Sequence, residues 1–325
     1  MMNPSVSVVL CTYNGVKYIE EQISSILRQT YPILELIIQD DCSTDGTYEL
    51  LRRLERDSEK IRVFRNDQQL GINRNFMSVL QRAQGDYIAI SDQDDIWELD
   101  KIENQMNCIG DKLFSSGFSC PFSESKEVTI YFDDRIPNYC LERVVYVSSL
   151  AGHTMLFKRS FLDKLPPLEK WSSFLMYDQF LQIIAAAYDS ISFCDKILVR
   201  QRRHLGAATY GKPESYEWTL SNIMNTVRRT YREYHQLRPF IRNYFMQIAD
   251  LLKSLPEEAV AKENTIRMAL LQSGQVPFSF LRLICFCVRW KKRILYAKQK
   301  NGLIAFMRAV YFPISCSDYF RYMIK

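Results

Sequence analysis

The chain has 325 residues, of which 47% are hydrophobic and 24% charged, a composition typical of a globular protein with one large domain and a smaller one. Nine cysteines without any Cys-x-x-Cys pair argue against a disulfide framework and a zinc site, and they indicate reduced thiols in a cytosolic protein. The first residues lack a basic segment and enter a strand at once, so we expect no targeting segment.

The charge of the chain is unevenly distributed. The net charge is +5 at pH 7, but the first 263 residues carry a net charge of −5. Residues 264–316 contain nine Lys or Arg and no Asp or Glu. A mildly acidic body is therefore followed by a strongly basic region, which needs an explanation of its own.

Predicted strands and helices alternate through the first 91 residues. Runs of β-branched and apolar residues at 5–11, 36–38, 61–64 and 87–90 predict four buried strands. Apolar residues at helical spacing predict helices between them, and Ser43 or Thr44 is the expected N-cap of the second helix. Strand–helix repeats with short connections predict an α/β fold with a doubly wound, mainly parallel sheet.

Carboxylates follow two of the predicted strands. Asp40 and Asp41 end the second strand, and Asp92, Asp94 and Asp95 follow the fourth. Because the carboxyl ends of parallel strands meet at one edge of a sheet, we expect these side chains to face one crevice. Carboxylates suit Mg²⁺ or Mn²⁺, which share their coordination shell with substrate phosphates, so a metal–diphosphate site is one interpretation. Turns that cap the following helices, the next of which should begin near residue 98, are the alternative.

Two common nucleotide-binding motifs are absent from the sequence. No Gly-x-Gly-x-x-Gly follows the first strand, and no Gly-x-x-x-x-Gly-Lys-Ser/Thr occurs anywhere. These absences argue against a dinucleotide-dependent oxidoreductase and against a P-loop enzyme.

Four segments carry a family resemblance when they are taken in order. They are 8–14, 40–47, Asn75 and 92–95, and they resemble the successive motifs of family 2 glycosyltransferases with the GT-A fold. With later motifs the resemblance covers residues 5–205 or so, and the Ser-Asp-Gln-Asp-Asp-Ile-Trp form resembles the branch of bacterial rhamnosyltransferase-like enzymes. It implies a nucleotide-sugar-binding domain at 1–205 and a helical C-terminal region at 206–325.

The resemblance implies roles for individual residues. Thr12 and Tyr13 would border the nucleotide base, Asp41 would accept a hydrogen bond from the pyrimidine, and Asp94 would bind the metal. Cys42 stands where the family usually has Gly. The full set of implied donor-binding residues is Thr12, Tyr13, Asn14, Asp41, Asn75, Asp92, Arg202 and Arg203, and the implied metal ligands are Asp92, Asp94 and His204.

Asp178 matches the catalytic Asp of the family. It opens a predicted helix, although the neighbouring Tyr177 and Gln179 depart from the commonest form of the motif. An inverting transferase needs one base within reach of the acceptor hydroxyl, and Asp178 suits that role. A carboxylate stabilised by the helix dipole is the structural alternative, and both roles are compatible.

A basic cluster follows the predicted strand at 197–201. Relatives often have Tyr-Arg-x-His here, with the Arg and His near the diphosphate, and Val199 replaces the Tyr. Arg presents a planar donor fork suited to phosphate, but the sequence leaves open whether Arg200, Arg202 or Arg203 fills the role. A solvated basic turn is the alternative reading.

The middle of the chain is harder to interpret. We expect a helix carrying Ile102 and Met106, a loop at 115–125, and strands at 128–132 and 144–147. Residues 149–159 predict a turn that enters a strand, and we assign His153 a structural role there in preference to a substrate contact.

The residues from 214 onward have helical periodicity, with Trp218 among the apolar positions. The apolar runs 278–288 and 303–314 are interrupted by Arg282 and Arg308, and the first is too short to span a bilayer. Basic helices rich in Phe and Leu are typical of interfacial anchors, so we expect peripheral contact with the inner membrane surface and no nucleic acid partner. Packing on the transferase domain or on a second subunit is the alternative.

These observations predict an inverting glycosyltransferase that moves a sugar from a UDP- or dTDP-sugar to a glycan or lipid-linked acceptor in bacterial surface polysaccharide synthesis, with Mg²⁺ or Mn²⁺ as cofactor. A catalytically silent scaffold or glycan-binding subunit is the alternative that the departures at Cys42, Tyr177 and Val199 support. A nucleotidyltransferase is a third class, but its Gly-rich N-terminal loop is missing.

Overall fold

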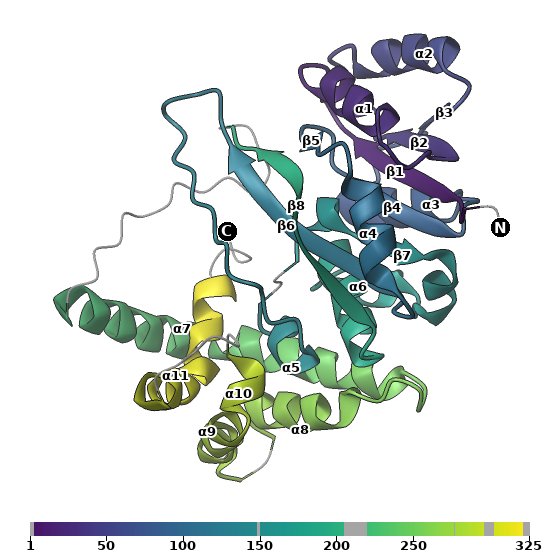
Figure 1. The fold of residues 1–325 in the computed structure, drawn as a ribbon. Helices are drawn as coiled ribbons and strands as arrows, with labels where there is room; N and C mark the ends of the chain where they lie inside the picture. Colours follow the sequence, from purple (N-terminus) through teal and green to yellow (C-terminus); the bar gives the residue numbers. More distant parts are fainter. Residues whose placement is uncertain (1–2, 148–149, 205–219, 276, 296–301, 321–325) are drawn as a thin grey trace. The chain divides into compact units, whose positions relative to one another are not determined.

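The computed structural model describes residues 3–147, 150–204, 220–275, 277–295 and 302–320 (Figure 1). The chain divides into two compact units. The sheet unit comprises Met1–Asp134, Leu150–Leu181 and Ser190–Pro213, and the helical unit comprises Arg135–Ser149, Gln182–Asp189 and Glu214–Lys325. The predicted boundary at 205/206 and Trp218 lie outside the described residues.

The sheet unit contains an eight-stranded sheet in the order β3-β2-β1-β4-β7-β6-β8-β5. The strands β3, β2, β1 and β4 are mutually parallel, β7 runs antiparallel to β4 and β6, β8 is parallel to β6, and β5 is antiparallel to β8. The predicted parallel sheet is therefore confirmed in its first half, and the second half is mixed. The strands are β1 (Val6–Thr12), β2 (Glu35–Asp40), β3 (Ile61–Arg65), β4 (Tyr87–Ser91), β5 (Ile96–Trp97), β6 (Phe114–Phe122), β7 (Leu156–Lys158) and β8 (Ile191–Arg202).

Helices cover both faces of the parallel strands. Helices α1 (Ile19–Leu27), α2 (Thr47–Asp57) and α4 (Lys101–Ile109) bury apolar side chains in one core cluster with alternate residues of β1 to β3. Helix α3 (Ile72–Leu80) packs against β1 and β2 with buried residues that are not part of that cluster. Alternate side chains of a strand point to opposite faces, so both faces of β1 and β2 are buried, whereas the edge strand β3 has a half-buried second face. Helices on both faces confirm the predicted doubly wound arrangement.

The predictions for residues 115–147 are wrong. The predicted loop at 115–125 is largely strand β6, the predicted strand at 128–132 lies outside any helix or strand, and residues 141–144 form helix α5 (Leu141–Val144). Strand β6 is poor in β-branched residues but pairs along its length with β8, whereas Ile130 and Tyr131 are exposed. The presence of a partner strand makes residues 114–122 a strand despite their low β preference, and residues 128–132 lack such a partner in the described structure despite their high β preference.

Two predicted helix starts also shift. Helix α2 begins after Gly46, which adopts a φ of 92°, and neither Ser43 nor Thr44 is its N-cap. The backbone N–H of Thr47 instead donates to Oδ1 of Asp45 at 3.0 Å. The short strand β5 precedes α4, so this helix begins three residues after residue 98.

The helical unit confirms the predicted C-terminal helices. Its core is built around the buried Tyr146, whose ring centroid lies 4.6 Å from those of Phe245 and Phe312 and whose hydroxyl donates to Oε1 of Gln272 at 2.7 Å. Within the described residues, none of the helices has both the length and the apolar character needed to cross a membrane. The helices are α7 (Leu220–Ser254), α8 (Lys262–Ser273), α9 (Ser279–Arg289), α10 (Lys291–Ile294) and α11 (Gly302–Phe320).

Candidate active site

The turns after β1 and β2 are tied together at the carboxyl edge of the sheet. The backbone N–H of Asp41 donates to the carbonyl of Thr12 at 2.9 Å. Asn14 adopts a φ of 50°, donates its backbone N–H to Oγ of Ser43 at 2.9 Å, and accepts the N–H of Thr44 on Oδ1 at 2.9 Å. Asn tolerates the left-handed region better than most residues, which explains this residue type at the turn.

Asp41 is buried and is the centre of a hydrogen-bond network. Its Oδ1 accepts from Nδ2 of Asn66 and from the N–H of Leu70, both at 2.7 Å, and its Oδ2 accepts from the N–H of Gly71 at 2.9 Å. The same Asn66 amide donates to Oδ1 of the buried Asn75 at 2.9 Å. Asp41 therefore fixes the 66–71 loop, and Asn75 orients the amide that Asp41 uses.

Cys42 is the residue that stands in place of the family's Gly, and its φ of 65° lies in the left-handed region. A side chain in that region costs about 1 kcal/mol. We expect Cys42→Gly to be more stable than Cys42→Ala by about 1 kcal/mol, because both variants lose the thiol and only Ala keeps the Cβ. Urea unfolding measures the difference, and equal stabilities of the two variants would contradict a strained backbone at this position.

Gln93 links the turn after β4 to the turn after β1. Its Oε1 accepts from Oγ1 of Thr12 at 2.7 Å and from the N–H of Tyr13 at 2.9 Å. A Cβ on Gly15 would lie 2.4 Å from this oxygen, so Gly15 leaves the space that the amide occupies. The hydroxyl of Thr12 is therefore engaged inside the protein, whereas the side chain of Tyr13 is exposed.

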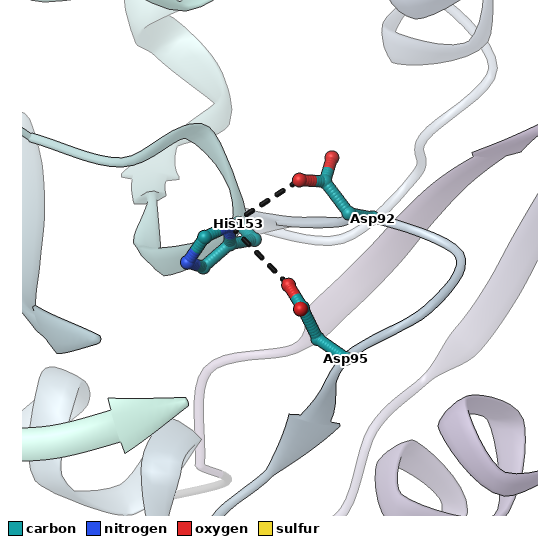
Figure 2. A group of neighbouring side chains, drawn as sticks. All are labelled: Asp92, Asp95 and His153. Atoms are coloured by element: carbon teal, nitrogen blue, oxygen red, sulfur yellow. Dashed lines mark hydrogen bonds and ion pairs between the residues drawn. The ribbon is translucent and has the colours of Figure 1, made fainter. Parts of the chain in front are cut away.

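Asp92, Asp95 and His153 form the cluster drawn in Figure 2. Nδ1 of His153 lies 3.2 Å from Oδ2 of Asp92 and 3.3 Å from Oδ2 of Asp95, and its Nε2 lies 2.7 Å from Oγ of Ser119. His153 and Asp95 are buried, and Asp92 is partly exposed. One ligand atom from each of the three lies within 4.8 Å of the others, so the group is compact enough to hold a metal ion.

Burial and mutual repulsion perturb the pKa values in this cluster. Burial raises the pKa of Asp95, and burial followed by the charge of Asp92 raises the pKa of Asp94. Burial opposes the charged form of His153, but Asp95 and Asp92 outweigh burial and raise its pKa. The cluster thus holds more negative charge than its surroundings neutralise, an environment that favours a bound cation.

Asp94 is paired with His204 at the end of β8. Nε2 of His204 lies 2.9 Å from Oδ2 of Asp94, and both side chains are partly exposed. The backbone N–H of Arg202 donates to Oδ1 of Asp95 at 2.9 Å, and its Nε donates to the carbonyl of Asp94 at 3.0 Å. Arg202 therefore holds the Asp94–Asp95 turn against the last residues of β8.

The guanidinium of Arg202 is enclosed by other side chains. It pairs with Glu21 and Glu124, and its Cζ lies 4.6 Å from the ring centroid of Tyr18 and 4.7 Å from that of Phe122. Although we predicted that Arg202 would contact the donor, the structure places its donor fork against two glutamates. Of the other two arginines in the basic cluster, Arg200 is exposed, and the N–H of Arg203 donates to the carbonyl of Phe122 at 2.8 Å.

Asp178 lies in the first turn of helix α6 (Tyr177–Ala187). The side chain of Asn73 fixes this turn, because its Oδ1 accepts the N–H of Tyr177 at 2.8 Å and its Nδ2 donates to the carbonyl of Leu175 at 3.0 Å. Burial raises the pKa of Asp178 to about 6. A carboxyl with such a pKa is ionised at neutral pH yet basic enough to accept a proton, as a general base requires.

Gly152 brings Asp178 close to the carboxylate cluster. A Cβ on Gly152 would lie 3.3 Å from Cβ of Asp178 and 2.6 Å from the hydroxyl of Tyr177, so the start of α6 packs directly on this glycine. His153 is the next residue of the same 3₁₀ turn, η1 (Gly152–Thr154). The predicted base thus packs on the residue that precedes His153, whose ring contacts Asp92.

The donor atoms of this edge fit a hard divalent cation. Carboxylate oxygens dominate, and the buried Oδ2 of Asp95 has the ring of His153 as its ion-pair partner at 3.3 Å. Of the predicted ligands, Asp94 and His204 lie in mutual contact. Asp92 is joined by Asp95, which belonged to the predicted metal–diphosphate carboxylates, and by His153, which was assigned a structural role. Carboxylates with one or two imidazoles suit Mn²⁺ or Mg²⁺.

The parallel half-sheet with carboxylates at its carboxyl edge, continued by a mixed half-sheet, has the arrangement of the GT-A fold. Staphylococcus aureus TarS in complex with UDP-GlcNAc superposes over 98% of this chain and 91% of its own, with a TM-score of 0.56 at 16% identity, which confirms the predicted GT-A fold. Residues 7–165 match the family model described as Glycosyl transferase family 2. This part of the chain therefore belongs to family 2 of the glycosyltransferases.

Two curated relatives extend the comparison. TuaG of Bacillus subtilis, named for teichuronic acid biosynthesis, is 41% identical over 120 residues, which are 37% of this chain and 45% of TuaG. The dTDP-rhamnosyl transferase RfbG of Shigella flexneri is 35% identical over 105 residues, which are 31% of this chain and 36% of RfbG. The chain thus spans less than half the length of these relatives, and the predicted likeness to rhamnosyltransferases is confirmed.

Proposed function

We propose that the protein is an inverting, metal-dependent glycosyltransferase that moves a sugar from a UDP- or dTDP-sugar to a glycan or lipid-linked acceptor in bacterial surface polysaccharide synthesis. The observation that carries this proposal is the packing of Asp178 against Gly152, beside the cluster of Asp92, Asp95 and His153, in a family 2 domain. It brings a candidate base and a candidate cation site together at one edge of the sheet.

The donor would lie along the carboxyl edge. The exposed Tyr13 offers a ring for the nucleotide base, and Oδ2 of Asp41 accepts one hydrogen bond in the structure, so it can accept another from a pyrimidine N–H. UDP and dTDP present the same pyrimidine edge. RfbG is named for a dTDP-sugar and TarS was solved with UDP-GlcNAc, which supports a pyrimidine nucleotide.

The reaction would proceed by one in-line displacement. Asp178 accepts the proton of the acceptor hydroxyl, whose oxygen then attacks the anomeric carbon as its bond to the nucleoside diphosphate breaks. Mn²⁺ or Mg²⁺, held by Asp94 with Asp92, His204 or the Asp95–His153 pair, would stabilise the negative charge of the leaving diphosphate. Arg202 keeps the metal-binding turn in place through its bonds to Asp94 and Asp95.

A thermal-shift panel of UDP- and dTDP-sugars tests the donor site. We expect one sugar nucleotide to raise the melting temperature in the presence of Mn²⁺, since a ligand that binds the native state must stabilise it. Asp94→Ala should abolish this shift, and Asp111→Ala, which removes an exposed carboxylate of the same unit, should keep it. If none of these nucleotides shifts the wild-type protein, the transferase proposal fails in favour of a silent scaffold.

The proposed place of this reaction is the inner membrane surface. A lipid-linked acceptor carries its reacting hydroxyl in the headgroup region, so the transferase has to work there. The basic C-terminal helices are the part of the chain suited to hold it at such a surface.

A further inference from the structure

The first half of helix α11 exposes several large apolar side chains. Ala305 and Ala309 are buried one turn apart and mark the side that packs within the helical unit. On the remaining sides Leu303 is 68%, Phe306 46% and Met307 61% exposed. A helix that is apolar on several sides is expected to be buried or to lie in a membrane environment.

The start of helix α9 repeats this feature. Phe278 is 81% exposed and has a φ of 54°, and Leu281 is 62% exposed. A bulky residue in the left-handed region is strained, and such strain is characteristic of functional positions. The backbone of Phe278 is the N-cap of α9, and its carbonyl accepts the N–H of Arg282 at 3.0 Å, while its ring stays exposed. Helices α9 and α11 pack on each other, so both exposed groups belong to one helical pair.

The charges carried by α9 and α10 themselves have a single sign. Arg282 and Arg289 lie on α9, Lys291 and Lys292 follow it, and residues 264–316 contain no Asp or Glu. A second copy of the same surface would bring positive charge against positive charge, which disfavours a symmetric dimer. A bilayer with anionic lipids matches both properties at once, because it attracts the cations and takes up the apolar side chains.

We propose that the apolar residues Phe278, Leu281, Leu303, Phe306 and Met307, with the cations of α9 and α10, form a docking surface for anionic phospholipid bilayers. We call it the α9–α11 surface. The purpose that we assign to this docking, access to a lipid-linked acceptor, rests on the proposed function. The surface itself is argued from exposure and charge alone, so vesicle binding and donor binding can fail separately.

Co-sedimentation with vesicles tests the surface. The full chain should bind vesicles of phosphatidylcholine mixed with phosphatidylglycerol, and high salt should release it because the attraction is partly electrostatic. Leu303→Gln/Met307→Gln should lower the partition coefficient about tenfold, since two exposed apolar side chains no longer enter the bilayer. Arg282→Gln/Lys292→Gln should lower it about tenfold as well, since two cations are lost.

The matched control is Leu34→Gln/Leu99→Gln. These residues of the sheet unit are 48% and 54% exposed, and their replacement should leave vesicle binding unchanged. The proposal is overturned if wild type ignores anionic vesicles, or if the α9 and α11 variants bind them as well as the control does. A wild-type dimer that Leu303→Gln/Met307→Gln dissociates, without vesicle binding, would overturn it in favour of a second copy. The thermal shift with sugar nucleotide should persist in every variant. Absence of this shift in the wild-type protein would contradict the proposed function and leave the docking surface untouched.

Discussion

Replacing Asp178 by Asn is expected to lower the rate of sugar transfer about 10³-fold while donor binding persists. The amide keeps the shape of the side chain but cannot accept the proton of the acceptor hydroxyl. Hydrolysis of the donor, in which water is the acceptor, gives an assay before the natural acceptor is known. The thermal shift with donor measures binding in the same variant.

The pH dependence of the rate follows from the same group. Burial raises the pKa of Asp178 to about 6, and the base is active only when it is ionised. The rate of wild type should therefore be constant near neutral pH and should fall as the pH drops through about 6. A bound cation nearby favours the ionised form and moves this limb to lower pH. The residual activity of Asp178→Asn should lack the limb.

Two controls make the result specific. Asp111→Asn changes an exposed carboxylate of the same unit and should leave both the rate and the pH limb unchanged. If Asp178→Asn transfers sugar as fast as wild type with its fold intact, Asp178 is not the base.

Gly152→Ala is expected to lower the rate about 10²-fold without unfolding the protein, because misplacing a catalytic group by about 1 Å costs that much. The new methyl group would lie 2.6 Å from the hydroxyl of Tyr177 and 3.3 Å from Cβ of Asp178, so the first turn of α6 has to move. The ring of Tyr177 cannot yield easily, since it is buried and stacks on Phe76 with centroids 4.0 Å apart.

A double variant isolates this steric cause. Tyr177→Phe removes the nearest atom, so Gly152→Ala/Tyr177→Phe should recover most of the lost rate. Tyr177→Phe by itself should behave nearly as wild type. A double variant no better than Gly152→Ala would show that the alanine acts in some other way. Circular dichroism confirms that each variant is folded.

The first ninety residues were predictable because local pattern and tertiary structure agree there. Strands β1, β2 and β4 are short apolar runs buried on both faces, and β3 at the edge buries one face. The motifs at their ends lie together because parallel strands share an edge. Strand β6 was missed because its Ser-rich sequence, which also contains Gly and Pro, has little β preference. A Cβ on Gly117 would lie 2.5 Å from Leu198, so close approach to β8 is what requires glycine there, and only the paired strand reveals it.

The candidate site shows the same limit. Asp94, His204 and Asp178 were predicted from motif residues, whereas His153 was assigned a structural role because a single histidine carries no pattern of its own. Its position between Asp92 and Asp95 depends on β7 pairing with β4, which is a contact distant in sequence. Asn73 was not predicted for a similar reason, because its side chain hydrogen-bonds to the backbone of Leu175 and Tyr177, more than a hundred positions later in the sequence.

The network around Asp41 constrains how the protein can evolve. The carboxylate that the proposed function assigns to the pyrimidine also accepts the backbone N–H groups of Leu70 and Gly71 and the amide of Asn66. A lineage that changed its nucleotide preference through Asp41 would have to rebuild the 66–71 loop in the same step. New donor specificity should therefore arise through neighbours that hold no loop, such as the exposed Tyr13, before it arises through Asp41.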